Sequence, residues 1–340
     1  MAKIQELLKD KTDEVDVESI LTRNPWIKKR NQKCILSPVS DGLLCGLFLS
    51  HYLDWEIIGF YDGKVCVIKD GESCYNDDTA FIDIEIYREG IKSMGHHMLS
   101  MYNNTLPDDW EVKFKECIQP NLERGYDKNN FRLKYPLATI HLLIKLLEKH
   151  VPINVIDSAI FPLIFTDGTY KVMTSYPENV MNWWRYLNVE DSPLLKNIFQ
   201  GEQYTLYKLM IEMDNFFRLR DEISVPRERG DRLKISNKDS SPTNIDQMNS
   251  GLFKISEDPK NRCIRFLILL SELTGWNFNS EKWHFENYNL LKFTKSDFKA
   301  QNWTIKKDNW KGLLDLNPLS WAMTSGDNLE FTIETPDKLI

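Results

Sequence analysis

The chain has 340 residues, 42% hydrophobic and 27% charged, which is the composition of a folded protein and excludes a disordered one. Its net charge of −7 argues against broad electrostatic binding of nucleic acid, although a local basic groove stays compatible with it. The sequence contains no run of about 18 apolar residues that would predict a membrane span, and the charged N-terminus lacks the apolar core of a secretory signal. The six cysteines form no C-x-x-C pair. We therefore expect a cytoplasmic protein with no membrane partner, long enough for two domains.

The first third of the chain alternates between strand and helix patterns. Residues 1–30 predict a short amphipathic helix and a charged connector, and a strand at 34–36 then runs through a polar turn into an apolar helix at 43–52. Strand, tight turn and helix is the arrangement in which open α/β sheets bind ligands, at the carboxyl ends of their strands. The next strands, 56–61 and 65–68, are joined by an Asp-Gly pair that predicts a hairpin.

Further along, the pattern predicts a strand at 80–86, an irregular stretch at 100–133, a helix at 136–149, a strand at 160–166 and a helix at 177–187. Asp83 lies inside the first of these strands, and the adjacent His96 and His97 follow it. Asp167 ends the second strand. His141 is a lone histidine on a mostly apolar helix face, and we expect it to pack rather than to bind a ligand.

The character of the sequence changes after residue 189. The pattern predicts helices at 204–219 and 259–273, a linker or mobile loop at 225–250, and a strand pair around 325–327. Because strands and helices no longer alternate regularly here, we predict an α/β domain over 31–189 and a separate α+β domain over 190–340.

Tryptophans interspersed with lysines in the C-terminal part allow two interpretations. They are Trp276, Trp283, Trp303, Trp310 and Trp321. Base stacking on such rings would bind a single-stranded nucleic acid. We favour the alternative, a small α+β domain whose core is built with tryptophan.

Three stretches, in chain order, resemble motifs of the DHH phosphoesterase superfamily, which is named for an Asp-His-His triplet. SPVSDGLLCG, from Ser37 to Gly46, takes the place of the family's first motif, a strand that ends in a His-x-x-x-Asp-x-Asp loop before a helix. Asp83 is similar to the aspartate at a strand end in the second motif. MGHHM, with His96 and His97, stands where the triplet is expected.

A fourth stretch resembles the segment that closes the family's motif set. In the family, a helix of the form A-T-x-x-L-x-x-L-L precedes an apolar strand ending in T-D-T-G and then a Thr/Ser-x-Pro-Glu helix start. This chain has LATIHLLIKLLEK and then FPLIFTDGTYKVMTSYPENVM, so Asp167 takes the position of the aspartate. The four stretches together cover residues 33–187.

The resemblance implies a fold, a reaction and a set of site residues. The fold would be a mainly parallel sheet with helices on both faces, and the reaction would be metal-dependent cleavage of phosphodiester or phosphoanhydride bonds with Mn²⁺ or Mg²⁺. The metal ligands implied are Asp41, Asp83, His96 and Asp167. The catalytic residues implied are Asp83, His96 and His97, and the substrate contacts implied are Ser40, Gly42 and His97.

The chain also departs from the family's pattern. Ser37 replaces the histidine of the first motif, Leu43 its second aspartate, and Gly95 the aspartate of the triplet. The ligands that remain suit one cation rather than two, because two close cations need a bridging carboxylate and further anionic ligands. The Gly-Gly-x-His signature of the family's usual second domain is absent from the sequence as well.

Each candidate has a structural explanation beside the functional one. Asp41 could cap the helix that follows it, whereas in the functional interpretation Gly42 lets a phosphate approach that helix. Asp83 could face solvent on an edge strand, since an unpaired buried carboxylate is costly. Asp167 could belong to a turn. His96 and His97 should point in different directions from one backbone, so at most one of them is expected to bind a metal directly.

Two functions stay open. The first is a divalent-metal phosphoesterase acting on a nucleotide, a short oligonucleotide or a related phosphate ester, which the survival of both histidines and Asp167 favours. The second is a catalytically degenerate relative that binds a nucleic acid or a protein, which the loss of ligands at Ser37 and Leu43 favours. A homodimer is left open.

Overall fold

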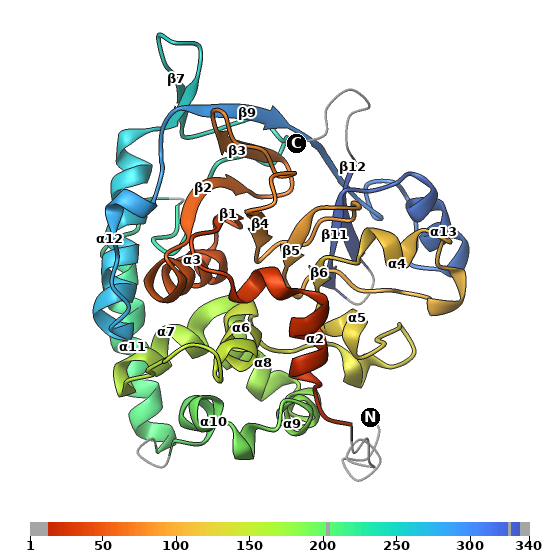
Figure 1. Ribbon diagram of the computed structural model, residues 1–340, viewed down its shortest axis with the longest axis horizontal. Helices are drawn as coiled ribbons and strands as arrows, with labels where there is room; N and C mark the ends of the chain where they lie inside the picture. The colour runs from red at the N-terminus through yellow and green to blue at the C-terminus, as the bar shows by residue number, and fades with distance from the viewer. Residues whose placement is uncertain (1–12, 202–204, 227, 326–327, 334–340) are drawn as a thin grey trace.

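The computed structural model describes residues 13–201, 205–226, 228–325 and 328–333, and a nine-stranded sheet lies at its centre (Figure 1). The strands are β1 (Lys33–Leu36), β2 (Glu56–Tyr61), β3 (Val65–Lys69), β4 (Thr79–Ile82), β5 (Lys92–Met94), β6 (Cys117–Ile118), β7 (Ile245–Gln247), β8 (Phe253–Ile255) and β9 (Tyr288–Lys292). Their order is β6-β5-β4-β1-β2-β3-β9-β8-β7. The strands from β6 to β2 are parallel, and every pairing from β2 to β7 is antiparallel. The predicted α/β class is confirmed, with a mixed sheet.

The helices pack mainly on one face of this sheet. They are α2 (Val17–Arg23), α3 (Ser40–Leu53), α4 (Trp110–Lys113), α5 (Pro120–Glu123), α6 (Thr139–Leu147), α7 (Ile160–Phe165), α8 (Thr169–Ser175), α9 (Pro177–Tyr186), α10 (Pro193–Gln200), α11 (Leu206–Asp221), α12 (Glu257–Thr274) and α13 (Lys307–Asp315). Side chains alternate along β1, so that Cys34 and Leu36 join the core formed with α3 and α6 while Ile35 faces the other way.

The opposite face of the sheet is covered differently from our prediction. Its buried cluster around Ile35, Ile58 and Phe81 is completed by loop residues such as Cys74 and Ile86, and no helical residue of the described chain belongs to it. The expectation of helices on both faces is therefore wrong. Helices are not required there, because short loops between β3, β4 and β5 already bring apolar side chains over that face.

The order of the strands creates a switch point at β1. The chain leaves β1 through α3 to β2 on one side, and later returns to place β4 on the other side of β1. In parallel sheets, ligands bind outside the carboxyl ends of the strands where the winding direction changes. Ser37 follows β1 and Asp83 follows β4 at this place.

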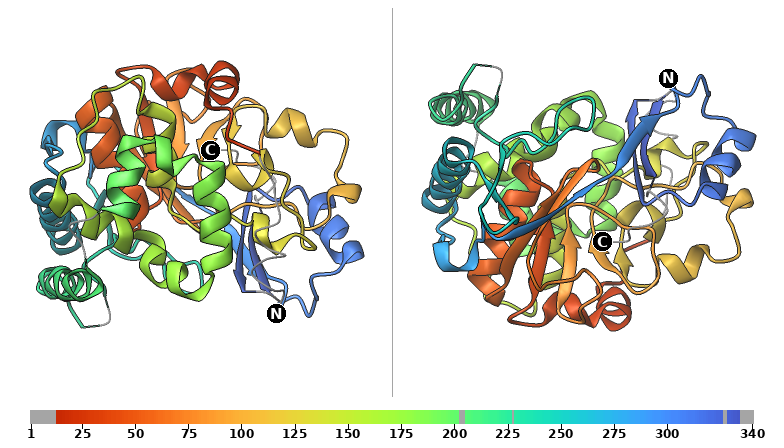
Figure 2. Two further views of the ribbon diagram at one scale, coloured as in Figure 1. Left: turned by 90° about the horizontal axis from the view of Figure 1, so that it is seen from below. Right: turned by 90° about the horizontal axis from the view of Figure 1, so that it is seen from above.

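Segments that follow the domain boundary predicted at residue 189 belong to the same sheet and core as the segments that precede it. Strands β7, β8 and β9 extend the central sheet, and α12 packs against α3 in the same core. A separate three-stranded antiparallel sheet forms from β10 (Thr294–Asp297), β12 (Asn328–Ile333) and β11 (Ser320–Ser325), in that order. Figure 2 shows this small sheet on the side of the molecule away from α11 and α12. The two sheets therefore do not divide the chain at residues 189/190.

The tryptophans of the C-terminal part mainly fill cores. Trp276 and Trp283 are buried in the main core, and Trp310 and Trp321 are buried between the small sheet, α13 and α4. Trp303 is only partly buried beside them. Their burial accords with the interpretation that we favoured, a core built with tryptophan.

Two predicted segments differ from the structure in an informative way. The run at 160–166 is the helix α7 and not a strand; Pro162 stands in the first turn, where its missing N–H breaks no helical hydrogen bond. The segment at 225–250, predicted as a linker or mobile loop, contains the strand β7, and Leu233 and Ile235 within it are buried in the main core. The helix predicted near the N-terminus falls largely on residues 1–12, outside the described residues.

None of the helices described combines the length and the apolar character needed to cross a membrane.

Candidate metal centre

Asp83 is placed by the end of β4. Its backbone N–H donates to the carbonyl of Met94 at 2.8 Å, and its φ of 62° lies in the left-handed region, which aspartate tolerates better than most residues. The residue is 1% exposed, and Oδ1 accepts a hydrogen bond of 2.7 Å from the hydroxyl of Thr139. Oδ2 has no hydrogen-bond partner among the described residues. Burial, together with the charges of Asp41 and Asp167, raises the pKa of Asp83 well above its usual value.

His96 lies in the bend after β5 and contacts oxygen atoms through both ring nitrogens. Nδ1 is 2.8 Å from the hydroxyl of Thr139, and Nε2 is 2.9 Å from Oδ2 of Asp167. Nδ1 also lies 3.9 Å from a carboxylate oxygen of Asp41 and 3.9 Å from one of Asp83. Buried Asn121 donates to the backbone carbonyl of His96 at 2.9 Å, which fixes the bend. His96 is thus the residue around which the three predicted aspartates converge.

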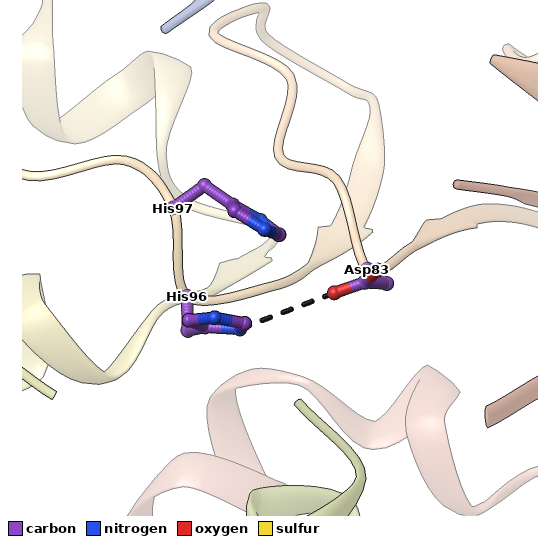
Figure 3. A group of neighbouring side chains, drawn as sticks. All are labelled: Asp83, His96 and His97. Carbon is purple, nitrogen blue, oxygen red and sulfur yellow. Dashed lines mark ion pairs between the residues drawn. The ribbon is translucent and has the colours of Figure 1, made fainter. Parts of the chain in front are cut away.

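The imidazole of His97 lies beside that of His96, with 4.2 Å between the ring centroids and 31° between the ring planes. One ligand atom each from Asp83, His96 and His97 lie within 4.8 Å of one another, which is close enough to hold a single metal ion (Figure 3). The expectation that the two histidines point in different directions is wrong. They follow β5 in a bend, so the alternation of successive side chains along a strand does not apply to them.

Glu85 orients His97. Its Oε2 lies 3.6 Å from Nδ1 of His97, while Oε1 accepts hydrogen bonds of 2.9 Å from both the backbone N–H of Met98 and the side chain of Gln119. Burial lowers the pKa of His97, but the carboxylates of Glu85 and Asp83 outweigh this and raise it overall. A Cβ at Gly95 would lie 2.6 Å from Oε2 of Glu85. The carboxylate of Glu85 therefore fills the space beside the histidines that an aspartate at position 95 would need.

Asp41 caps a helix, although not the one we expected. It lies in the first turn of α3, is buried, and accepts the backbone N–H groups of Thr139 at 2.7 Å and Ile140 at 3.2 Å. Both groups belong to the first turn of α6, whose N–H groups have no intrahelical partner. Asp41 thus anchors α6 to α3 and holds Thr139 against Asp83 and His96.

The other predicted residues lie near this cluster with different roles. Asp167 has a φ of 49°, and its side chain is half exposed. The partial desolvation of its carboxylate would raise its pKa, but the ion pair with His96 outweighs this effect and lowers the pKa. The Ser40 hydroxyl accepts a long hydrogen bond of 3.4 Å from Thr166. A Cβ at Gly42 would lie 2.0 Å from the carbonyl oxygen of Ser37, so packing alone requires glycine there.

Thr139, Gln119 and Asn121 also hold the site together, although they were not among the predicted site residues. Thr139 bridges Asp83 and His96, and its signal was the Ala-Thr pair at the start of the helix motif. Gln119 and Asn121 follow the short strand β6, which no apolar periodicity marks. Their contacts join segments far apart in the sequence and are not visible in a local pattern.

Two cavities flank the cluster. The smaller, of about 170 Å³, is lined by Asp83, Glu85 and His97, and by Lys295 and Trp321 of the C-terminal part. The larger, of about 420 Å³, is lined by the following residues among others: His96, His97, Lys134, Asp167, Tyr176 and Met323. Ala322 of β11 lines both cavities. Residues of the small sheet therefore line both cavities, opposite the residues that follow the parallel strands.

The chain matches no protein-family model, no curated protein and no solved structure. The resemblance to DHH phosphoesterases accordingly stays a prediction based on four sequence motifs.

Proposed function

We propose that this protein is a divalent-metal-dependent phosphoesterase, with Asp83, His96 and His97 as the metal ligands and a nucleotide or short oligonucleotide as the substrate. The observation that carries the proposal is the convergence of these three side chains at the switch point of a parallel sheet. Parallel strands bring residues that follow different strands to one edge, and this is the place where such folds bind ligands.

The donor set fits one cation. Among the described residues, Asp83 has a buried oxygen without a hydrogen-bond partner, and three further carboxylates, those of Asp41, Glu85 and Asp167, lie near the two imidazoles. A positive ion would offset this excess of negative charge. Two imidazole ligands favour Mn²⁺ over Mg²⁺, which prefers a shell of oxygen atoms. Such an ion would supply a bound water of lowered pKa and would shield the charge of a phosphate.

The surrounding residues would hold this site in position. Asp167 and Glu85 contact the two imidazoles, and Thr139 holds the carboxylate of Asp83. Partners of this kind orient metal ligands, and their loss weakens metal affinity by about 10- to 100-fold. Lys134 lines the larger cavity beside Asp167 and would place a positive charge near a bound phosphate.

A second function, a degenerate relative that binds a partner without catalysis, is supported by two observations. Both oxygens of Asp41 are already used by the backbone of α6. Leu43 is fully buried among apolar side chains, so position 43 offers no site for the family's second aspartate. On this view, the cluster would preserve the fold rather than a reaction.

The experiment that separates the two functions measures metal binding and hydrolysis together. Purified protein is titrated with Mn²⁺ by calorimetry and incubated with mononucleotides, short oligonucleotides, cyclic dinucleotides and polyphosphate. Asp83→Asn should abolish both binding and hydrolysis, because the amide cannot replace an anionic ligand. Asp54→Asn is the matched control: Asp54 also has a left-handed φ, 60°, but its side chain is about half exposed and far from the cluster in the fold.

The expected result is Mn²⁺-dependent release of product by the wild type and by Asp54→Asn only. If the wild type binds no Mn²⁺ and cleaves nothing in the panel, the phosphoesterase proposal is wrong and the binding function takes its place. Hydrolysis that survives in Asp83→Asn would also contradict the assignment of the ligands.

A further inference from the structure

The larger cavity has an aromatic rim that the metal cluster does not explain. Phe131, at the start of a 3₁₀ turn (Phe131–Leu133), is 40% exposed, and Tyr176, which precedes α9, is 45% exposed. Both line the cavity, and their ring centroids are 5.5 Å apart at an interplanar angle of 64°. In an edge-to-face pair each ring keeps at least one face free of the other. Each of these two exposed rings therefore lines the cavity and has at least one face that the other ring does not cover.

The pair is held in place by a buried side chain. Nδ2 of Asn179 donates to the carbonyl of Phe131 at 2.9 Å and to that of Lys134 at 3.4 Å. Asn179 is buried in the first turn of α9, so these bonds tie α9 to the turn that carries Phe131. The backbone of the turn that carries Phe131 is thus fixed against α9 before any ligand arrives, which lowers the entropic cost of binding one.

The same cavity reaches two of the three proposed metal ligands, His96 and His97, whereas Asp83 lines the smaller cavity. His96, His97 and Asp167 line the larger cavity together with Lys134, while Met323 and Thr324 of β11 lie on the wall as well. Its volume of about 420 Å³ falls within the ordinary range for small-molecule sites. It thus brings together two residues of the metal cluster, a lysine and two exposed aromatic rings, which match the phosphate and the base of one nucleotide.

We infer that the larger cavity is a nucleobase subsite, in which Phe131 and Tyr176 stack on the base of a nucleotide whose phosphate lies at the Asp83, His96 and His97 cluster. The inference rests on the proposed function and names the part of the substrate that this face recognises. Stacking on aromatic side chains tolerates every base, because each base has a π-face. The subsite therefore accepts all four bases and selects nucleotides against phosphate esters that carry no base.

The test compares ligands with and without a base. The full chain is titrated by calorimetry with the four ribonucleoside 5′-monophosphates and with ribose 5-phosphate, both with and without Mn²⁺. Nucleotides should bind at least about 10-fold more tightly than ribose 5-phosphate, with small differences among the four bases. The double variant Phe131→Ala/Tyr176→Ala should weaken nucleotide binding roughly 5- to 100-fold and leave ribose 5-phosphate unchanged.

Tyr207→Ala is the matched control, because Tyr207 is a 76% exposed aromatic residue on α11, outside the cavity. Equal affinity for nucleotides and ribose 5-phosphate overturns the inference, and this comparison needs no variant. An unchanged nucleotide affinity in the double variant, or the same loss in Tyr207→Ala, also overturns it.

The inference and the proposed function can fail separately. If Mn²⁺-dependent cleavage of polyphosphate occurs while the double variant leaves nucleotide binding intact, the nucleobase subsite is wrong and the phosphoesterase stands. If nucleotides bind, the double variant weakens that binding and no Mn²⁺ is bound, the subsite stands and the phosphoesterase is wrong.

Discussion

Gly95→Ala tests whether Glu85 occupies the space beside the two histidines. The added Cβ would lie 2.6 Å from Oε2 and 2.8 Å from Cδ of Glu85, which is closer than real Cβ contacts. Gly95 does not have a positive φ, so alanine is compatible with its backbone and the clash is the main cost. The consequence of the substitution therefore depends on how far the side chain of Glu85 can move.

The structure indicates that Glu85 can move little. It is buried, and its Oε1 is held by hydrogen bonds of 2.9 Å from Met98 and 2.9 Å from Gln119. Overpacking a core costs about 1–3 kcal/mol, and a hydrogen bond to a charged group contributes about 1.5–3 kcal/mol. If the carboxylate moves enough to weaken one of these bonds, Gly95→Ala should lower the free energy of unfolding by about 2–4 kcal/mol.

The same substitution should cost little once the carboxylate is gone. Glu85→Ala alone leaves the buried Met98 N–H without this acceptor and should cost about 1–3 kcal/mol. In that background Gly95→Ala should add less than about 0.5 kcal/mol, so that the double-mutant cycle gives a coupling energy of about 1.5–4 kcal/mol. Urea denaturation of the four proteins measures all the terms.

Gly312→Ala is the matched control. It lies within α13 with nothing near the position of a Cβ, and alanine there should stabilise the protein by about 0.5–1 kcal/mol. An equal cost of Gly95→Ala in the presence and absence of Glu85 would refute the reasoning, because the clash would then lie elsewhere.

Three further predictions concern residues around the site. Burial lowers the pKa of His141 to about 3 from 6.5, so the unfolded state takes up a proton first and stability falls as pH drops below 6.5. His141→Gln keeps a hydrogen-bond acceptor at the start of α6. Between pH 6.5 and 4, the free energy of unfolding of this variant, measured by urea titration, should fall by about 3 kcal/mol less than that of the wild type. Parallel curves of unfolding free energy against pH for the two proteins would contradict this. Asp41→Ala should lower the free energy of unfolding by about 2–3 kcal/mol and change the Mn²⁺ affinity measured by calorimetry less than ~10-fold. Loss of Mn²⁺ binding with unchanged stability would show that Asp41 is a metal ligand and not a helix cap. Leu43→Asp, which supplies the family's second aspartate, should destabilise by at least about 3 kcal/mol and abolish the cooperative thermal transition; a folded variant with tighter Mn²⁺ binding would show that position 43 can reach the site.

Local signals predicted the elements that depend on local chemistry. The strands β2 and β3 and their Asp-Gly hairpin follow the prediction closely, because turn residues and apolar runs specify a hairpin without help from the rest of the chain. The prediction of a strand at 160–166 failed because six apolar residues fit a buried strand and a buried helix equally well. The position of this run against α11 and α12, far along the chain, decides the outcome.

The site residues that follow the ends of strands could be predicted from the sequence. The contacts between segments far apart in the sequence, which fix the geometry of the site, could not. Asp83 and His96 meet because they follow the parallel strands β4 and β5, which end at one edge of the sheet. Asp167 also reaches His96, but from the turn after the helix α7 and not from the end of a strand. The shared direction of the two histidines depends on a bend held by Asn121, and the position of Asp83 depends on Thr139. No periodicity in the sequence reports contacts of this kind.

The pairing of β3 with β9 has a consequence for how the chain is made. Strand β3 pairs in register from Val65 with Lys292 to Lys69 with Tyr288, so its partner is synthesised more than two hundred residues later. Until then, β3 is an open edge of four apolar residues, and such edges recruit strands from other chains. Chains released before residue 288 should therefore aggregate, and long-range pairing of this kind should make completion of the sheet a slow step in folding.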